Sequence, residues 1–212
     1  KYMPITWLTS LIGSLALIGT PLFSGFYSKD MIIEAVKFST IPGSGFAYFS
    51  VMAGVFITAF YSFRMYFLVF HGEERFGKAH HDAHHGDEHH HGLAPGQKPH
   101  ETPWVVTLPL VMLAVPALFI GYYGVQPMLF GDYFRGVIHV NAANHSAMHE
   151  LSKHFHGAMA MALHAFSTPV FWLALAGVVV SWFFYLKRPD IPEKIKNSLA
   201  PIYTLLENKY YF

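Results

Sequence analysis

The chain has 212 residues, of which 53% are hydrophobic and 13% are charged, and its formal net charge is +1 at pH 7. A typical soluble domain carries about 25% charged residues and a disordered chain needs low hydrophobicity, so this composition excludes both classes. The small net charge and the scattered Lys and Arg residues argue against nucleic acid as a partner. The sequence contains no cysteine, which excludes disulfide frameworks and thiol chemistry. We therefore expect a protein of the lipid bilayer.

Uncharged stretches predict an all-α, polytopic membrane protein with about four transmembrane helices, the first of them broken. The hydrocarbon core of a bilayer is about 30 Å thick and takes about 20 helical residues. The predicted spans are a broken helix in residues 1–38 and unbroken helices over residues 45–70, 102–125 and 168–186.

The first apolar block is too long for one straight helix. Ile5–Val36 would extend about 48 Å at about 1.5 Å per residue. A break is expected at Ile18-Gly19-Thr20-Pro21, because proline lacks an amide hydrogen and clashes with the preceding turn, and Ser24 could cap a second half-helix. Broken helices at membrane depth line cavities and mark ion sites in transporters.

Three charged residues, Lys29, Asp30 and Glu34, follow this break. An ionisable side chain inside a membrane is costly, which makes a functional role the first hypothesis. Lysine suits proton transfer, because desolvation favours its neutral form whereas a nearby carboxylate favours its charged form. The alternative is that all three lie at the outer interface, with Lys29 extending toward the headgroups.

Further polar residues follow along the chain. Arg64 lies about six residues from the cytoplasmic end of the second predicted span, where it either reaches the headgroups or pairs with an acid in the proton path. In the His-rich loop over residues 71–101, His80/His84 and His81/His85 have the i, i+4 spacing that suits zinc or nickel, although a solvated variable loop is the simpler interpretation. The histidines of the outer loop and the next helix entrance either exchange protons or are interfacial polar residues. They are His139, His145, His149, His154, His156 and His164.

The connections predict the topology. A His-rich loop is expected over residues 71–101, an outer loop with an amphipathic helix over 126–167, and an interfacial segment over 187–212. Lys and Arg are in excess at the chain start, the His-rich loop and the chain end, which places these three segments in the cytoplasm. Because the sequence begins without Met and ends among aromatic residues, we expect it to be a piece of a longer chain.

Three stretches of the sequence are distinctive. The first comprises Met3–Thr6 and the run GSLALIGTPLFSGFYSKD, which ends at Asp30. The second is FITAFYSFRM at Phe56–Met65, followed by Phe70-His71-Gly72, and the third is Tyr203–Phe212. These stretches resemble the antiporter-like subunits of respiratory complex I, the NADH:quinone oxidoreductase. Between about residues 75 and 165 the similarity rests on position and hydropathy only.

The resemblance implies a piece from the C-terminal half of such a subunit, in a bacterial inner membrane. Lys29 would carry protons in a half-channel leading to the outer side, Asp30 would tune it, and Thr20, Pro21, Glu34 and Arg64 would support them. Residues 187–212 would lead into a lateral helix. The partners would be other membrane subunits of the complex, which would hold the flavin, the iron–sulfur clusters and the quinone. The resemblance implies no cofactor and no metal in this chain, a non-redox part in a proton-translocating enzyme, and no activity for this piece alone.

Other functions remain open at this point. The same residues fit a subunit of a multisubunit sodium/proton antiporter or of a membrane hydrogenase. A divalent-metal transporter built around the His-rich loop and a passive membrane anchor are the alternatives from other classes.

Overall fold

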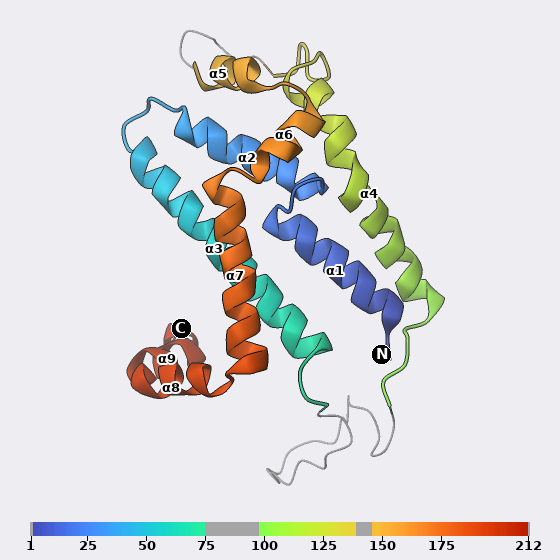
Figure 1. Cartoon of the computed structure of the whole chain (residues 1–212), viewed down its shortest axis with the longest axis vertical. Helices are drawn as coiled ribbons and strands as arrows, with labels where there is room; N and C mark the ends of the chain where they lie inside the picture. Colours follow the sequence, from blue (N-terminus) through green and yellow to red (C-terminus); the bar gives the residue numbers. More distant parts are fainter. Residues whose placement is uncertain (1, 75–97, 139–145, 212) are drawn as a thin grey trace.

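A computed structural model describes residues 2–74, 98–138 and 146–211, and these residues form helices and no strand. The all-α prediction is therefore confirmed. The helices, drawn in Figure 1, are α1 (Pro4–Ile18), α2 (Ser24–Lys37), α3 (Ser44–Phe70), α4 (Trp104–Leu129), α5 (Ser146–His154), α6 (Ala158–Ala165), α7 (Pro169–Trp182), the π-helical η1 (Phe183–Lys187), α8 (Asp190–Ser198), α9 (Ala200–Glu207) and the 3₁₀-helical η2 (Lys209–Tyr211). Most of the His-rich loop lies outside the described residues, as do His139, His145 and the metal site considered for that loop.

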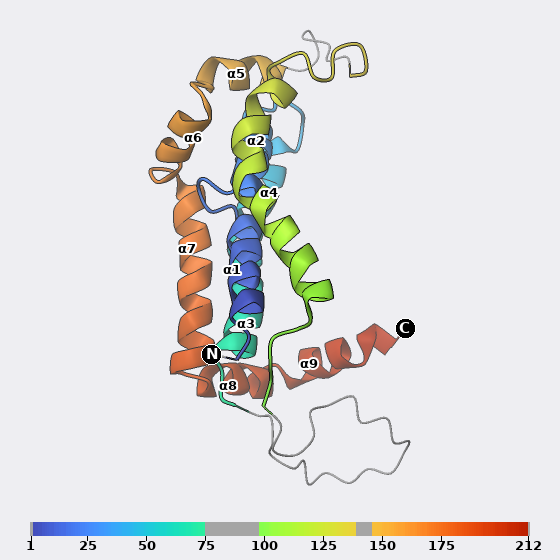
Figure 2. The ribbon, with the colours of Figure 1, turned by 90° about the vertical axis from the view of Figure 1, so that its right-hand side faces the viewer.

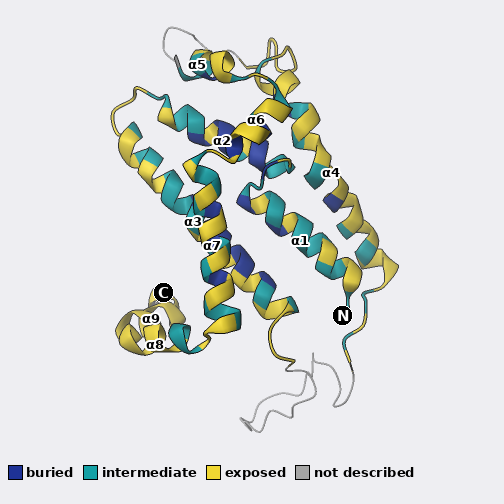
Figure 3. Ribbon diagram, viewed as in Figure 1, coloured by how far each residue is buried: buried dark blue, intermediate teal, exposed yellow. Residues whose placement is uncertain are grey.

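Three helical stretches in the described part are long and apolar enough to cross a membrane. They are Ser44–Phe70, Trp104–Leu129 and Pro169–Lys187, and α1 is a shorter apolar helix. Most of the surface of α4 is exposed, as Figure 3 shows, so its apolar side chains are free to meet lipid or other helices. These features fit a polytopic membrane protein.

The helix ends gather at two opposite ends of the bundle. The end of α3, the start of α4 and the end of α7 lie at one end, where α8 and α9 run across the bundle rather than along it (Figure 2). We call this the α8 end. The turn between α2 and α3 and the helix α5 lie at the other, which we call the α5 end.

The half-helix α2 lies between two hydrophobic clusters. Its residue Ile33 packs with side chains of α1, α3 and α7, whereas Phe26, Tyr27 and Met31 pack with α4, α5 and α6. Tyr27 is 1% exposed, which makes it one of the most buried large side chains among the described residues. Packing on both sides fixes the position of α2, and with it the position of Lys29 and Asp30.

Glycines bring the helices close together. A Cβ atom at Gly177 of α7 would lie 2.6 Å from the carbonyl oxygen of Phe56 in α3, and one at Gly25 would overlap the carbonyl oxygen of Ala16 in α1. Small residues of this kind allow close backbone approach where packing, not the hydrophobic effect, joins helices in a membrane.

The break between α1 and α2 begins at Gly19. Gly19 has a left-handed φ of 79°, its N–H donates to Ala16 O at 3.2 Å, and Thr20 N–H donates to Leu15 O at 3.0 Å, which is the pattern of a Schellman cap. Phe23 N–H then donates to Thr20 O at 3.1 Å across a turn in which Leu22 has a φ of 78°. The predicted break at Ile18-Gly19-Thr20-Pro21 is thus confirmed: α1 ends at Ile18, and Pro21 occupies the second position of the turn that follows.

Candidate functional site

A narrow cavity of about 10 Å³ lies at the break, and the predicted lysine and aspartate line it. Its walls come from the end of α1, from α2, from Val55 in the middle of α3, and from the link between α6 and α7. The lining residues are Ile18, Gly19, Pro21, Phe26, Lys29, Asp30, Ile33, Val55, Ala165, Thr168, Val170 and Phe171.

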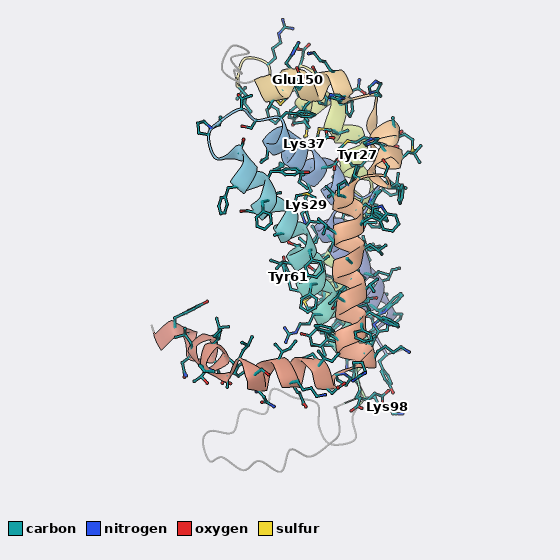
Figure 4. The ribbon with its side chains drawn as sticks, turned by 60° about the vertical axis from the view of Figure 1, so that its left-hand side comes forward. Tyr27, Lys29, Lys37, Tyr61, Lys98 and Glu150 are labelled. Atoms are coloured by element: carbon teal, nitrogen blue, oxygen red, sulfur yellow. The ribbon has the colours of Figure 1, made fainter. Side chains whose placement is uncertain are left out.

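The cavity lies inside the bundle, toward its α5 end. Val55 is about 22 Å along α3 from Phe70 at the α8 end and about 16 Å from Ser44 at the α5 end, at about 1.5 Å per residue. Lys29 is deeper in the bundle than Lys37, as the side-chain view in Figure 4 shows.

Lys29 and Asp30 differ in their surroundings although they are neighbours in sequence. Asp30 is 7% exposed, and Lys29 is half-buried. The Lys29 side chain runs back over the break, where a Cβ atom added to Gly19 would lie 3.3 Å from its Cδ atom. The end of α1 therefore holds the stem of the lysine, whereas the packing around α2 holds the aspartate.

Ser24 joins the start of α2 to α4 by two hydrogen bonds. The Ser24 hydroxyl donates to the carbonyl oxygen of Pro116 at 2.7 Å and accepts from the N–H of Gly121 at 2.9 Å. Gly121 is required at this point, because a Cβ atom there would lie 2.6 Å from Ser24 Cα. The expectation that Ser24 caps α2 is wrong: Phe23 is the N-cap residue and makes no side-chain capping bond, because the Ser24 hydroxyl bonds across to α4.

A second, larger cavity of about 550 Å³ adjoins the first. One face of α2 contributes Asp30, Glu34 and Lys37, whose i, i+4, i+7 spacing aligns them along the helix. The opposite wall comes from α5, α6 and the link between them: it contains Phe155, Ala160, Met161 and three histidines, His154, His156 and His164. Because Asp30 lines both cavities, it lies where they meet.

The remaining predicted residues fall into two groups. Thr20 and Pro21 form the break, and Pro21 lines the first cavity. Arg64 lines neither of these two cavities: it is exposed on α3, with its guanidinium 5.2 Å from the centre of the Tyr185 ring in η1. The structure thus brings five of the six predicted residues to the break and its two cavities, and places Arg64 apart from them.

Sequence reasoning missed several residues of the site. Val55, Ala165 and Thr168 line the first cavity, and the N–H of Gly121 donates to the Ser24 hydroxyl. No local pattern points to Ala165 or Gly121, which approach the break from distant parts of the chain.

The described residues are helical, with three long apolar helices and a broken first block, and so fit a multi-pass membrane protein. No protein-family model matches the chain. It is 60% identical, over 213 aligned residues, to NADH-quinone oxidoreductase subunit L of Neisseria meningitidis serogroup A, and the alignment covers all of this chain and 32% of that protein. It is 36% identical to NAD(P)H-quinone oxidoreductase chain 5 of a Picosynechococcus species and 32% identical to NADH-ubiquinone oxidoreductase chain 5 of Schizophyllum commune. Both alignments cover the whole of this chain, together with 30% of the Picosynechococcus protein and 28% of the Schizophyllum protein.

The homologues of this chain are therefore subunit L of NADH-quinone oxidoreductase and its chain 5 relatives, and the chain matches a fragment of that subunit. It spans about a third of the length of these curated relatives. The predicted resemblance to the complex I subunits is thus confirmed.

Proposed function

We propose that this chain is part of a proton-translocating membrane subunit of an NADH-quinone oxidoreductase, and that protons pass through Lys29 and Asp30. The observation that carries the proposal is the position of these two residues: a half-buried lysine and a buried aspartate line the same cavity at a helix break, and Asp30 also lines the second cavity. The relatives support a membrane subunit of this enzyme. Electron transfer, with its flavin, iron–sulfur clusters and quinone, belongs to partner subunits.

The chemistry of the pair follows from electrostatics. Burial favours the neutral form of both side chains, whereas proximity favours the ammonium with the carboxylate. When the distance between the Lys29 ammonium and the Asp30 carboxylate changes, the proton affinity of both changes with it. A conformational or electrostatic signal from partner subunits can therefore make Lys29 bind a proton at Nζ and then release it.

The proposed direction of transfer is toward the α5 end. We place this end on the outer side of a bacterial inner membrane and the α8 end in the cytoplasm, because Lys and Arg are in excess beside the helix ends at the α8 end. The other membrane subunits of the complex would cover much of the exposed apolar surface of α4. A metal-transporter function rests on the His-rich loop outside the described residues and gains no support from the relatives.

Substitution of Lys29 tests this function in the complete subunit, assembled in its complex and reconstituted in vesicles. Lys29→Ala is expected to lower proton pumping and coupled quinone reduction while the complex still assembles, because alanine carries no proton. Pumping is measured with a pH-sensitive dye and NADH oxidation in parallel. Lys98→Ala, an exposed lysine at the α8 end (Figure 4), is the matched control and should pump normally. Unchanged pumping by Lys29→Ala would refute the proposed role.

A further inference from the structure

The second cavity extends the charged path beyond Asp30. Asp30 and Glu34 are one helical turn apart on the same face of α2, so their Cβ atoms are about 6 Å apart, and both side chains line this cavity. Glu34 is half-buried, whereas the three histidines on the opposite wall are exposed. Titratable groups thus continue from a buried carboxylate, through a partly buried one, to imidazoles that reach the surface.

We propose that Glu34 receives the proton from Asp30, and that His154, His156 and His164 release it to the water at the α5 end. This inference rests on the function proposed above and adds to it the exit of the proton path and four proton-carrying residues. The cavity is lined by the chain's own α5–α6 segment, which makes that segment the wall of the exit.

The proton is conserved in each step. The carboxylic acid of Asp30 gives its proton to the Glu34 carboxylate and becomes a carboxylate. Glu34 then gives the proton to a ring nitrogen of a neutral imidazole, directly or through water, and the imidazolium releases it to bulk water. Imidazole suits the last step because its ordinary pKa of about 6.5 lets it bind and release protons near neutral pH.

Charged and titratable groups surround the cavity. Lys37 is exposed at the end of the same helix face as Asp30 and Glu34 and lines the cavity with them. His154 is held in place by Phe38, whose ring stacks on the imidazole with centroids 5.4 Å apart and an interplanar angle of 2°. The charged and titratable groups that face Glu34 across or along this cavity are Asp30, Lys37, His154, His156 and His164.

Glu34 is tested by two substitutions in the complete subunit of the assembled complex. Glu34→Gln is expected to lower the rate of proton pumping at least about tenfold, since an amide neither binds nor releases a proton, and Glu34→Asp should restore most of it. Glu207→Gln, an exposed glutamate at the end of α9, is the control and should pump normally. Normal pumping by Glu34→Gln would overturn the proposal.

The histidines are tested by chemical rescue. A triple variant, His154→Gln, His156→Gln and His164→Gln, should pump several-fold more slowly in vesicles with dilute buffer on the α5 side. Entrapment of a concentrated, impermeant sulfonate buffer on that side should restore the rate, because the buffer then takes over the release of the proton. His149→Gln, an exposed α5 histidine that does not line the cavity, should behave like the unsubstituted protein. A slow triple variant that added buffer does not restore would contradict this role for the imidazoles.

Access of water to the cavity gives a readout that does not depend on pumping. Because this chain has no cysteine, a thiol placed by Ala160→Cys at the cavity wall reports on that position alone in this part of the subunit. It should react with an impermeant thiol reagent added on the α5 side, whereas Ile57→Cys on the apolar face of α3 should not. An unreactive Ala160→Cys would overturn the exit path.

The outcomes separate the two proposals. If Lys29→Ala stops pumping while Glu34→Gln and the triple histidine variant pump normally, the exit through Glu34 is wrong and the function of Lys29 stands. If Lys29→Ala pumps normally, the proposed function fails, and the exit path fails with it.

Discussion

Gly19 is the single residue on which both the helix break and the lysine depend. Its φ of 79° lies in the region that glycine occupies without steric cost, and its missing side chain leaves room for the methylene chain of Lys29. The same residue therefore ends α1 and gives Lys29 a surface along which to lie. A side chain at position 19 would therefore strain the backbone of the break and displace the Lys29 side chain at the same time.

Gly19→Ala is expected to impair pumping in the complete complex, as a weaker form of Lys29→Ala. The left-handed conformation costs a residue with a Cβ atom about 1–2 kcal/mol, and the new methyl group would press on Lys29 Cδ. The dye assay for pumping measures the effect. Gly13→Ala is the matched control, because nothing lies within 4 Å of a Cβ atom there, and it should leave pumping unchanged. Equal pumping by the two variants would show that Gly19 does not position Lys29.

At the scale of elements, α2 is held by bonds and packing to helices far away in the chain. Ser24 bonds to α4 at Pro116 and Gly121, and the two hydrophobic clusters fix the opposite faces of α2. Hydrogen bonds between membrane helices contribute modestly, about 0.6 kcal/mol on average, so the packing contributes most of the stability. The bonds of Ser24 act chiefly on register, since they align the first turn of α2 with one turn of α4.

Ser24→Ala is expected to loosen this junction by about 1 kcal/mol, because it removes both hydrogen bonds between the Ser24 hydroxyl and α4. Faster hydrogen–deuterium exchange of the α4 segment that contains Gly121 measures the loss. Ser50→Ala is the control, because the Ser50 hydroxyl bonds only to Phe46 O within its own helix at 2.9 Å. If the Gly121 segment exchanges at the same rate in both variants, Ser24 does not hold the junction.

At the scale of the whole molecule, the short α1 brings the break inside the bundle. Its 15 residues extend about 22 Å, which is less than the hydrocarbon thickness of about 30 Å. The N-terminus of α1 is fixed at the α8 end by Glu101, which precedes α4. The Glu101 carboxylate accepts bonds from Ile5 N–H at 2.7 Å and from the Thr6 hydroxyl at 2.6 Å. These bonds join α1 to the start of α4 and so fix how far α1 reaches into the membrane.

The Glu101 contact predicts a dependence of stability on pH. The bond from Thr6, followed by those from backbone N–H groups, lowers the pKa of Glu101 below its ordinary value of 4.5. A lowered pKa in the folded state means that the contact stabilises above about pH 4.5 and that its contribution is lost as the pH falls through the lowered pKa. Glu101→Gln should therefore lower the melting temperature of the solubilised complex at pH 7, and the difference from the unsubstituted protein should shrink below pH 4. A difference that stays constant down to pH 3 would contradict this assignment.

Some features of this protein follow from neighbouring residues alone. The all-α class, the long apolar helices and the broken first block are visible in the sequence, because bilayer thickness, helix geometry and proline chemistry act over short stretches of chain. The position of Lys29 and Asp30 directly after the break is likewise a local feature. Their resemblance to known subunits also rests on a continuous run of residues, which ends at Asp30.

Other features depend on residues that meet from distant parts of the chain. Ser24 bonds to Gly121, the residue 97 positions later, instead of capping its own helix. The α6 residue His164 shares a cavity with Asp30, whereas Arg64, on an equally apolar helix, is turned away from both cavities. Local periodicity carries no information about such contacts, because they depend on how whole helices pack. That packing, and not the local sequence, places Asp30 where the two cavities meet.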